Sequence, residues 1–319
     1  MPSPVIGHQD RRLLAIGLVL VTYIFFALCD TAAKWMALSG MPPAQVAFGR
    51  YAVQFAFMLG LALPRMGLSA FATKRPALQI ARASGLLAMT AFNFFAILYL
   101  PLTVTSSIMF GMPLLITALS VPLLGEHVGW RRWAAIFVGF FGILIVIQPW
   151  SADFHWAVIL SLGSITAGAL YFILTRKLTA TESTMSMQLY AGLVGTVVLL
   201  PFALSNWTWP DGPANWLIFF GVGLAAMTGH QISIIAHRFA QASVLAPFAY
   251  SQIIWMTLSS WLIFGDAPTI WLFIGGPIVI ASGYYIWLRE RALAKEVVSP
   301  ISPPEAEHRV AQEAETPRH

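Results

Sequence analysis

The feature that most constrains this chain is a succession of ten apolar segments, most of them about 20 residues long, separated by short polar breaks. A helix needs roughly 20 mostly apolar residues to cross the hydrocarbon core of a bilayer. Within that core a helix also satisfies its own backbone hydrogen bonds. The sequence therefore predicts an all-α integral membrane protein with ten transmembrane helices. The expected segments lie at about residues 13–36, 43–63, 77–99, 103–124, 131–149, 155–177, 185–204, 213–237, 243–264 and 269–288.

The composition supports a membrane protein. The chain is 58% hydrophobic and only 10% charged, whereas soluble domains carry about 25% charged residues. Its net charge of +5 does not indicate a nucleic-acid partner, because the basic residues lie in short clusters between apolar segments. The single cysteine, Cys29, excludes an intramolecular disulfide and a multi-cysteine metal site. It is expected to be a small packing residue of the first segment.

The two ends of the chain are expected to flank the spans without crossing the membrane. The first apolar segment is longer than the hydrophobic region of a signal peptide and no clear cleavage site follows it, so it is interpreted as a retained helix after a cytoplasmic N-terminus at 1–12. Residues 297–319 are rich in Pro, Glu and Ser and have no apolar face. They are predicted to form a disordered cytoplasmic tail.

Basic residues are distributed unevenly over the breaks, and this bias predicts the orientation. On one side of the membrane Lys34 alone lies near a span end. Three aspartates, Asp153, Asp211 and Asp266, accompany it. Because positively charged loops remain in the cytoplasm, both termini are expected there. The residues assigned to the cytoplasmic side are Arg11, Arg12, Arg65, Lys74, Arg75, Arg82, Arg131, Arg132, Arg176, Lys177, Arg238, Arg289, Arg291 and Lys295.

The chain shows signs of an internal duplication. Residues 99–149 and 239–289 share one layout, in which a short polar turn with a Gly-acid pair separates two apolar spans. Ten spans divide into five plus five, at about 13–149 and 155–290. An odd number of spans in each repeat inverts the second copy relative to the first. Inverted repeats are a common plan of secondary transporters, in which two halves rock about a central site.

The span region resembles a known family of transporters. It is similar to proteins of the drug/metabolite transporter superfamily that carry two EamA-type repeats of five helices. The resemblance implies a secondary transporter of the bacterial inner membrane that moves a small organic metabolite by alternating access. Some members of the most similar bacterial subgroup carry riboflavin or S-adenosylmethionine, and others in the superfamily export amino acids. The matching stretches are FALCDTAAKWM, PPAQVAFGRY, YLPLTVTSS, LLGEHVGWRRWAAIFVGFFGILIVIQP, LAPFAYSQIIW and FGDAPTIWLFIGGPIVIASGYYIWLRE.

Three charged residues near the non-cytoplasmic side are candidates for substrate binding or coupling. Asp30 and Lys34 lie one turn apart on one face of the first helix, and Arg50 lies two turns into the second. A charge in the membrane costs about 2.5–3.5 kcal/mol even on the mildest scale. We expect the three to meet in one cluster. In one interpretation the cluster is a gate or charge clamp, in which Asp30 binds protons or cations and Arg50 binds an anionic group. In the other it is a structural ion pair of Asp30 with Arg50 or Lys34 that fastens the two helices together.

Uncharged polar residues give weaker candidates. His230 in the eighth helix has a side chain that titrates near neutral pH, so it is either a proton relay or a hydrogen-bonded packing residue. Gln231 lies beside it. Asn93 lies at a comparable depth of the third helix and is expected to line a cavity and form hydrogen bonds.

The ninth helix carries the aromatic candidates. Tyr250, Gln252 and Trp255 lie on it, and Phe110 aligns with Tyr250 in the first repeat. These side chains either line a cavity for a flat organic substrate or pack against lipid and other helices.

The Gly-acid pairs place one acid at each of two helix ends. Glu126 and Asp266 follow Gly125 and Gly265. They are interpreted as structural helix-end acids rather than substrate ligands.

The sequence indicates no enzyme. It contains no GxSxG, HExxH or P-loop motif, so neither catalytic residues nor a metal or cofactor is expected. A polytopic membrane enzyme acting on a lipid or acyl substrate is the alternative. The expected partners are a small-molecule substrate and the lipid bilayer. Small residues such as Gly139 and Gly142 permit close helix approach, although their spacing does not match the helix-dimer motif. A homodimer is left open as a further partner.

Overall fold

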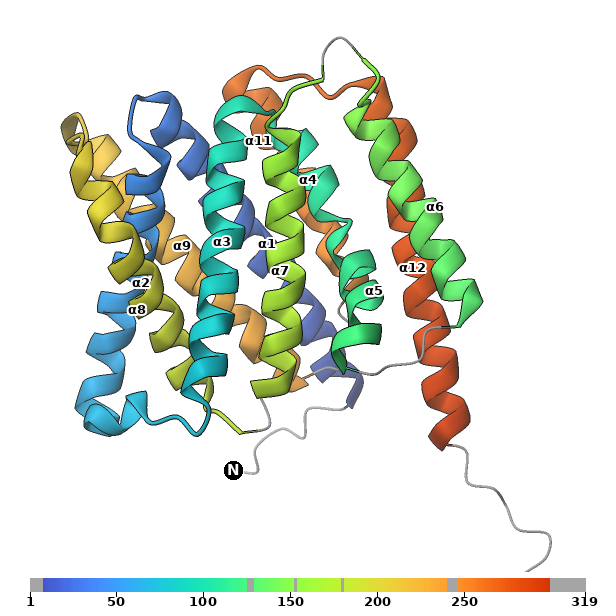
Figure 1. The fold of residues 1–319 in the computed structure, drawn as a ribbon, viewed down its shortest axis with the longest axis horizontal. Coiled ribbons are helices and arrows are strands. Elements are labelled where there is room, and N and C mark those ends of the chain that lie inside the picture. Colours follow the sequence, from blue (N-terminus) through green and yellow to red (C-terminus); the bar gives the residue numbers. More distant parts are fainter. Residues whose placement is uncertain (1–7, 125–128, 152–153, 179–180, 240–245, 299–319) are drawn as a thin grey trace, which may run out of the picture.

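The computed structural model describes residues 8–124, 129–151, 154–178, 181–239 and 246–298, and within these ranges all regular structure is helical (Figure 1). This confirms the predicted all-α class. The helices are α1 His8–Leu38, α2 Pro43–Met66, η1 Gly67–Phe71, α3 Pro76–Tyr99, α4 Leu102–Met109, α5 Met112–Leu124, α6 Trp130–Ile147, α7 Val158–Leu178, α8 Thr184–Ser205, α9 Gly212–Phe239, η2 Ala246–Ser251, α11 Gln252–Phe264 and α12 Ile270–Val298.

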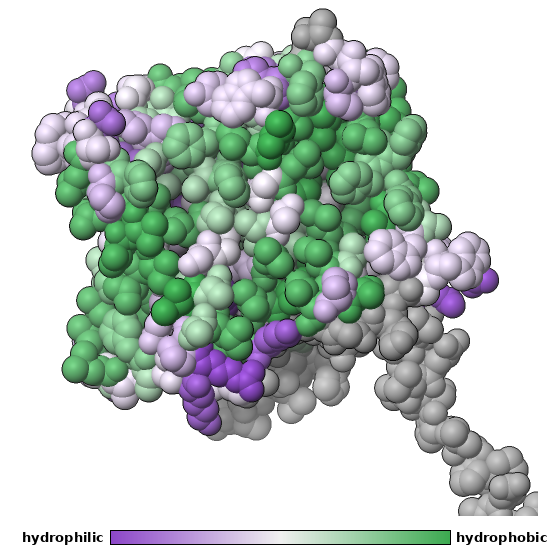
Figure 2. Space-filling model, in the orientation of Figure 1, coloured by the Kyte–Doolittle hydropathy of each residue, from purple (hydrophilic) through white to green (hydrophobic). Residues whose placement is uncertain are grey.

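The described helices supply the ten predicted spans. Eight segments are long and apolar enough to cross a membrane, and the two shorter apolar helices, Trp133–Ile147 and Gln252–Phe264, complete the set. Large apolar side chains such as Phe137 and Leu262 project outward from the bundle. Figure 2 shows such side chains covering most of the visible face, with hydrophilic residues at its upper and lower edges. A surface of this kind matches the hydrocarbon core of a bilayer.

Proline and glycine set several helix ends. Pro43 and Pro76 are the first residues of α2 and α3, where the missing N–H costs no hydrogen bond. Gly265 follows α11 with φ 75°, a left-handed conformation that glycine adopts without strain. The N–H of Asp266 then bonds to the carbonyl of Ser260 at 3.0 Å, which closes the end of the helix.

The fourth and ninth spans are each discontinuous. The predicted segment 103–124 is interrupted between α4 and α5 at Phe110–Gly111. In the second repeat, η2 passes into α11 at Ser251, at the corresponding position. The fourth span is therefore two helices rather than the single one expected from the sequence. The break coincides with Gly111 and with Pro113, which has no N–H for the helix hydrogen bonds. The rings of Phe110 and Tyr250 contact each other edge-on, with centroids 5.1 Å apart.

The helix packing has the pattern of a two-fold relation between the repeats. Helix α1 packs on α9, and their counterparts α7 and α3 pack on each other in the same way. Helix α2 packs against its own counterpart α8, and α6 against α12. Figure 1 shows α6 and α12 side by side along one flank of the bundle.

The α6–α12 pair confirms this relation at single residues. A Cβ on Gly275 would lie 2.5 Å from the carbonyl oxygen of Gly142, so the two backbones touch there. The symmetry-related pair is Ser282 with Ala135, and the Ser282 hydroxyl donates to the Ala135 carbonyl. Small residues thus allow the fifth helices of both repeats to approach closely.

The bundle has two ends that differ in charge. The basic end is where α2 ends and α3 begins, and it carries the exposed residues Arg65, Lys74 and Arg75. The opposite end is where α1 ends and α2 begins. Arg82 was expected among the loop charges, but it lies inside α3 and is buried. Arg82 follows the start of α3 by almost two turns, so it is a buried residue of the third helix rather than a loop charge. The expected tail begins within α12, and its residues from 299 onward lie outside the described part.

Candidate functional site

A buried polar cluster joins the first three helices. It consists of Asp30 from α1, Arg50 and Tyr51 from α2, and Thr90 and Asn93 from α3, all of them buried. At 1.5 Å per residue, Asp30 lies about 12 Å before the end of α1 and Arg50 about 11 Å after the start of α2, and both of these helix termini are at the opposite end of the bundle. The hydrocarbon core is about 30 Å thick. The cluster is therefore in the half of the membrane region nearer the opposite end.

Asn93 holds the carboxylate of Asp30. Its Nδ2 donates to Asp30 Oδ1 at 3.1 Å, which links α1 to α3. Thr90 lies on the same face of α3, one turn earlier, and faces α2. The sequence placed Asn93 in a cavity as a hydrogen-bonding residue, and the structure gives it Asp30 as its partner.

Arg50 is held on α2 by neighbouring polar groups. Its Nη1 donates to Thr90 Oγ1 at 2.6 Å, and its guanidinium lies 4.8 Å from the centre of the Tyr51 ring. The Tyr51 hydroxyl donates to the Leu86 carbonyl at 3.0 Å and lies 2.9 Å from Thr90 Oγ1. Arg50 and Asp30 carry opposite formal charges within the same buried cluster. The two side chains nevertheless form no direct ion pair among the described residues.

Lys34 does not join this cluster, although it lies one turn from Asp30. Its Nζ donates to Asp266 Oδ2 at 2.8 Å and to the Leu100 carbonyl at 3.1 Å. It also lies 4.9 Å from the centre of the Phe264 ring. The expected meeting of Asp30, Lys34 and Arg50 is therefore wrong for Lys34, because this side chain extends toward the end of α11.

The Lys34–Asp266 ion pair ties the two repeats together at the opposite end. Lys34 is buried, whereas the Asp266 side chain is 33% exposed. Asp266 lies at the end of α11, where the sequence placed it, and its carboxylate binds a helix of the other repeat. Glu126, its counterpart in the first repeat, lies outside the described residues.

Arg82 forms a second buried polar site, nearer the basic end. Its Nε donates to Thr175 Oγ1 at 2.8 Å and its Nη2 to the Tyr171 hydroxyl at 3.1 Å, both on α7. Its Nη1 donates to the Met187 carbonyl of α8 at 3.0 Å. The guanidinium also lies 4.7 Å from the centre of the Tyr171 ring. Arg82 thus fastens α3 to two helices of the second repeat.

The remaining candidates have described side-chain contacts outside the five residues of the polar cluster. The ring of His230 packs on Phe26 of α1, with centroids 4.9 Å apart. The Gln231 side chain donates to the Met58 sulfur at 3.4 Å. Both side chains thus contact neighbouring helices from α9, His230 on α1 and Gln231 on α2.

The described ninth-span candidates have different neighbours. Tyr250 contacts Phe110 and lies against Gly283 of α12, where an added Cβ would meet its hydroxyl. Gln252 is half-buried at the start of α11. Trp255 is partly exposed and lines a shallow groove of about 150 Å³ between α1 and α11.

Sequence reasoning missed Tyr51, Thr90 and Arg82 as members of buried polar sites. A signal for each was present in the sequence. Tyr51 follows Arg50 directly, and Thr90 lies three residues before Asn93 on the same helical face. Arg82 lies within the apolar segment expected at 77–99, where a charge needs partners.

Comparisons with known proteins identify the family. The model of the EamA-like transporter family matches residues 13–148 and 155–288. A riboflavin transporter from Vibrio cholerae is 28% identical over 271 residues, covering 84% of this chain and 91% of the relative. An S-adenosylmethionine uptake transporter from Rickettsia felis is 26% identical over 294 residues, covering 89% of this chain and 96% of the relative.

A solved crystal structure also resembles this chain. It aligns with a TM-score of 0.60 at 17% identity, and the match covers 90% of this chain and 99% of the other. At that identity the likeness shows the fold alone. The family match extends over both halves of the bundle, including all the helices that form the polar cluster. This chain belongs to the EamA-like transporter family.

Proposed function

We propose that this protein is a secondary transporter that moves a small organic metabolite by alternating access, with the polar cluster of α1, α2 and α3 as its substrate site. The named relatives support small-metabolite transport in a multi-pass protein of the bacterial inner membrane. They do not favour the alternative of a polytopic membrane enzyme. One observation carries the choice of site: Asp30 and Arg50 bring opposite charges into one buried cluster without pairing directly.

The cluster suits a substrate that carries both charges. Arg50 would bind an anionic group such as a carboxylate, with Thr90 and Tyr51 fixing the guanidinium. Asp30, oriented by Asn93, would bind an ammonium or another cation of the same molecule. Such a substrate would supply the direct pairing that the two side chains lack, and so repay the cost of burying them. The amino-acid part of S-adenosylmethionine has both groups, whereas riboflavin has neither.

The Lys34–Asp266 pair is proposed to close the opposite end in this conformation. It connects α1 of the first repeat to the end of α11 of the second. Motion of one repeat against the other would separate these two residues and open the path to the polar cluster. Both termini are proposed to lie in the cytoplasm, so that the opposite end faces outward.

Uptake into sealed proteoliposomes containing the purified chain tests the proposed function. S-adenosylmethionine, a neutral amino acid and riboflavin would be supplied separately, at two external pH values, with protein-free liposomes as the control. We expect accumulation or exchange of an unmodified zwitterionic compound, and a pH effect if Asp30 binds protons. Transport of riboflavin alone would overturn the proposed substrate class. Failure of a broad metabolite panel, together with chemical conversion of a compound in detergent, would overturn the transporter proposal.

A further inference from the structure

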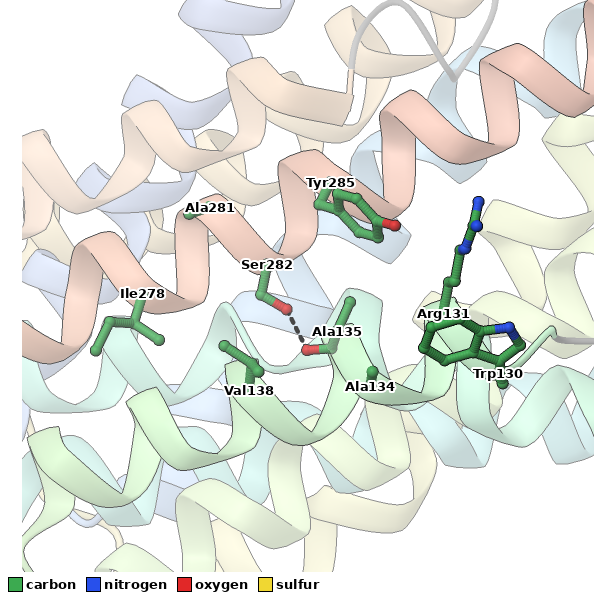
Figure 3. Close-up of a pocket in the computed structure, with 9 residues that line it drawn as sticks. All are labelled: Trp130, Arg131, Ala134, Ala135, Val138, Ile278, Ala281, Ser282 and Tyr285. Carbon is green, nitrogen blue, oxygen red and sulfur yellow. Dashed lines mark hydrogen bonds between the residues drawn. The ribbon is translucent and has the colours of Figure 1, made fainter.

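A groove between α6 and α12 opens on the flank of the bundle, away from the polar cluster. It has a volume of about 510 Å³. Its walls are mainly apolar and none of the lining residues is acidic. Figure 3 shows Ser282 and Ala135 bonded at its floor, with Tyr285 and Arg131 toward one end. The lining residues are Trp130, Arg131, Ala134, Ala135, Val138, Ile278, Ala281, Ser282 and Tyr285.

The register of the two helices places the charged end of this groove at the membrane surface. Because α6 and α12 are antiparallel and Ala135 meets Ser282, Arg131 lies level with Ile286. Arg289 lies one turn beyond Tyr285, toward the basic end. Arg131 lines the groove and Arg289 lies one turn beyond it on α12, so each helix has one arginine near the basic end of the groove. Trp130 is 75% exposed beside them, as is typical of residues at the membrane interface.

The length of the groove matches part of an acyl chain. It extends along α6 from Arg131 to Val138, about 10 Å at 1.5 Å per residue. One leaflet contributes about half of the 30 Å hydrocarbon core. The floor of Ala134, Ala135, Ala281 and Ser282 leaves room for methylene groups at the height where a lipid tail would lie.

We propose that this groove binds an anionic phospholipid from the leaflet at the basic end. The phosphate pairs with Arg131 and Arg289, and one acyl chain occupies the apolar floor between the helices. Basic pockets between transmembrane helices are known sites for anionic head groups. A lipid bound in the groove would contact both α6 and α12 on the side that the rest of the bundle does not cover. It would therefore stabilise the packing of these two helices.

Thermal unfolding of the full-length chain in detergent micelles, titrated with lipid, tests this site. Dioleoylphosphatidylglycerol is expected to raise the unfolding midpoint in a saturable manner, unlike dioleoylphosphatidylcholine or the soluble head group glycerophosphoglycerol. Arg131→Gln is expected to weaken the phosphatidylglycerol response about five-fold, since one basic residue near the surface contributes about 1 kcal/mol. Ala281→Phe, which fills the groove from α12, is expected to abolish it.

Arg65→Gln is the matched control, because Arg65 is an exposed arginine of the same end but lies on α2. This variant should respond to phosphatidylglycerol like the unchanged chain. An equal response to phosphatidylcholine would overturn the proposal, as would an equal response to the free head group. If Arg65→Gln weakened the response to phosphatidylglycerol as much as Arg131→Gln does, the effect would be a diffuse effect of charge at this end, and the proposal would also be overturned.

Discussion

Two arginines buried in the membrane region, Arg50 and Arg82, have very different surroundings. Arg82 uses Nε, Nη1 and Nη2 in hydrogen bonds to α7 and α8. Arg50 has the Thr90 hydroxyl and the Tyr51 ring as its described contacts on α3 and α2, and it also interacts with the Cys29 side chain of α1. A guanidinium has five N–H donors. Arg82 is therefore committed to holding helices together, whereas Arg50 retains capacity for a ligand.

Replacing Arg82 tests its structural role. Arg82→Gln is expected to lower the free energy of unfolding by about 3 kcal/mol or more, because hydrogen bonds to a charged group contribute roughly 1.5–3 kcal/mol each. Thermal or denaturant unfolding in detergent would measure this. Arg75→Gln is the control, since Arg75 is exposed at the start of the same helix. Equal stability of the two variants would contradict the assigned role.

The Lys34–Asp266 pair gives a prediction about conformation. Asp266→Asn is expected to favour opening of the opposite end and to change the exchange rate about five-fold, which corresponds to about 1 kcal/mol for a partly exposed ion pair. Substrate affinity should change less, because Asp266 does not touch the polar cluster. Exchange kinetics in proteoliposomes would measure both. The exposed Asp211, near the same end, supplies the control Asp211→Asn.

Exchanging the two charges of the Lys34–Asp266 pair gives a second test of its role in opening. The double variant Lys34→Asp with Asp266→Lys should return the exchange rate toward that of the unchanged chain. An Asp266→Asn variant that behaves like Asp211→Asn would show that the ion pair does not control opening.

Helix pairs between the repeats depend on close backbone contacts. At Gly275 of α12, an added Cβ would lie 2.5 Å from the carbonyl oxygen of Gly142, an atom that cannot rotate away. At the neighbouring Gly276 the nearest atom would be 4.0 Å away. These adjacent glycines therefore differ in what a methyl group would meet.

This difference predicts opposite tolerances to the same substitution. Gly275→Ala is expected to lower the free energy of unfolding by about 1–3 kcal/mol, as overpacking does. Gly276→Ala should leave it unchanged or raise it slightly, because alanine favours helix more than glycine. Unfolding of both variants in one detergent measures the difference. Similar effects of the two substitutions would contradict the close α6–α12 contact.

The helices themselves were predictable, but their contacts were not. The length of each apolar segment was enough to place the spans, because crossing a bilayer requires that length whatever the neighbours do. The break at Phe110–Gly111 coincides with Gly111 and Pro113, a local helix-breaking signal that the span assignment did not use. Lys34 and Asp266 are 232 residues apart. Their pairing depends on how two repeats dock, which a single sequence does not specify.

The candidate site was predicted in part. Asp30, Arg50 and Asn93 were chosen because polar groups are costly in a membrane, and the structure brings them into one cluster. His230, Gln231 and Trp255 were chosen for the same reason or for their aromatic surface, and their described contacts are with other side chains. Which polar residues meet depends on helix rotation.

The orientation of the whole molecule gives a prediction that chemical labelling can test. With Cys29 replaced by serine, Ser69→Cys places one thiol at the basic end and Ser205→Cys places one at the opposite end; both serines are exposed. A membrane-impermeant maleimide added to intact cells is expected to label the cysteine at position 205 and not the one at position 69. The reverse pattern would contradict cytoplasmic termini.

The measurement that tests the central claim most directly is transport by the double variant Asp30→Asn with Arg50→Gln. Initial rates and their pH dependence would be measured in proteoliposomes, beside the unchanged chain and Asp211→Asn, after each protein is shown to be folded. If the polar cluster binds the substrate, the double variant should lose at least 90% of transport, about 1.4 kcal/mol or more in free energy, while Asp211→Asn remains active. Unchanged rates and an unchanged pH profile in the double variant would contradict the account.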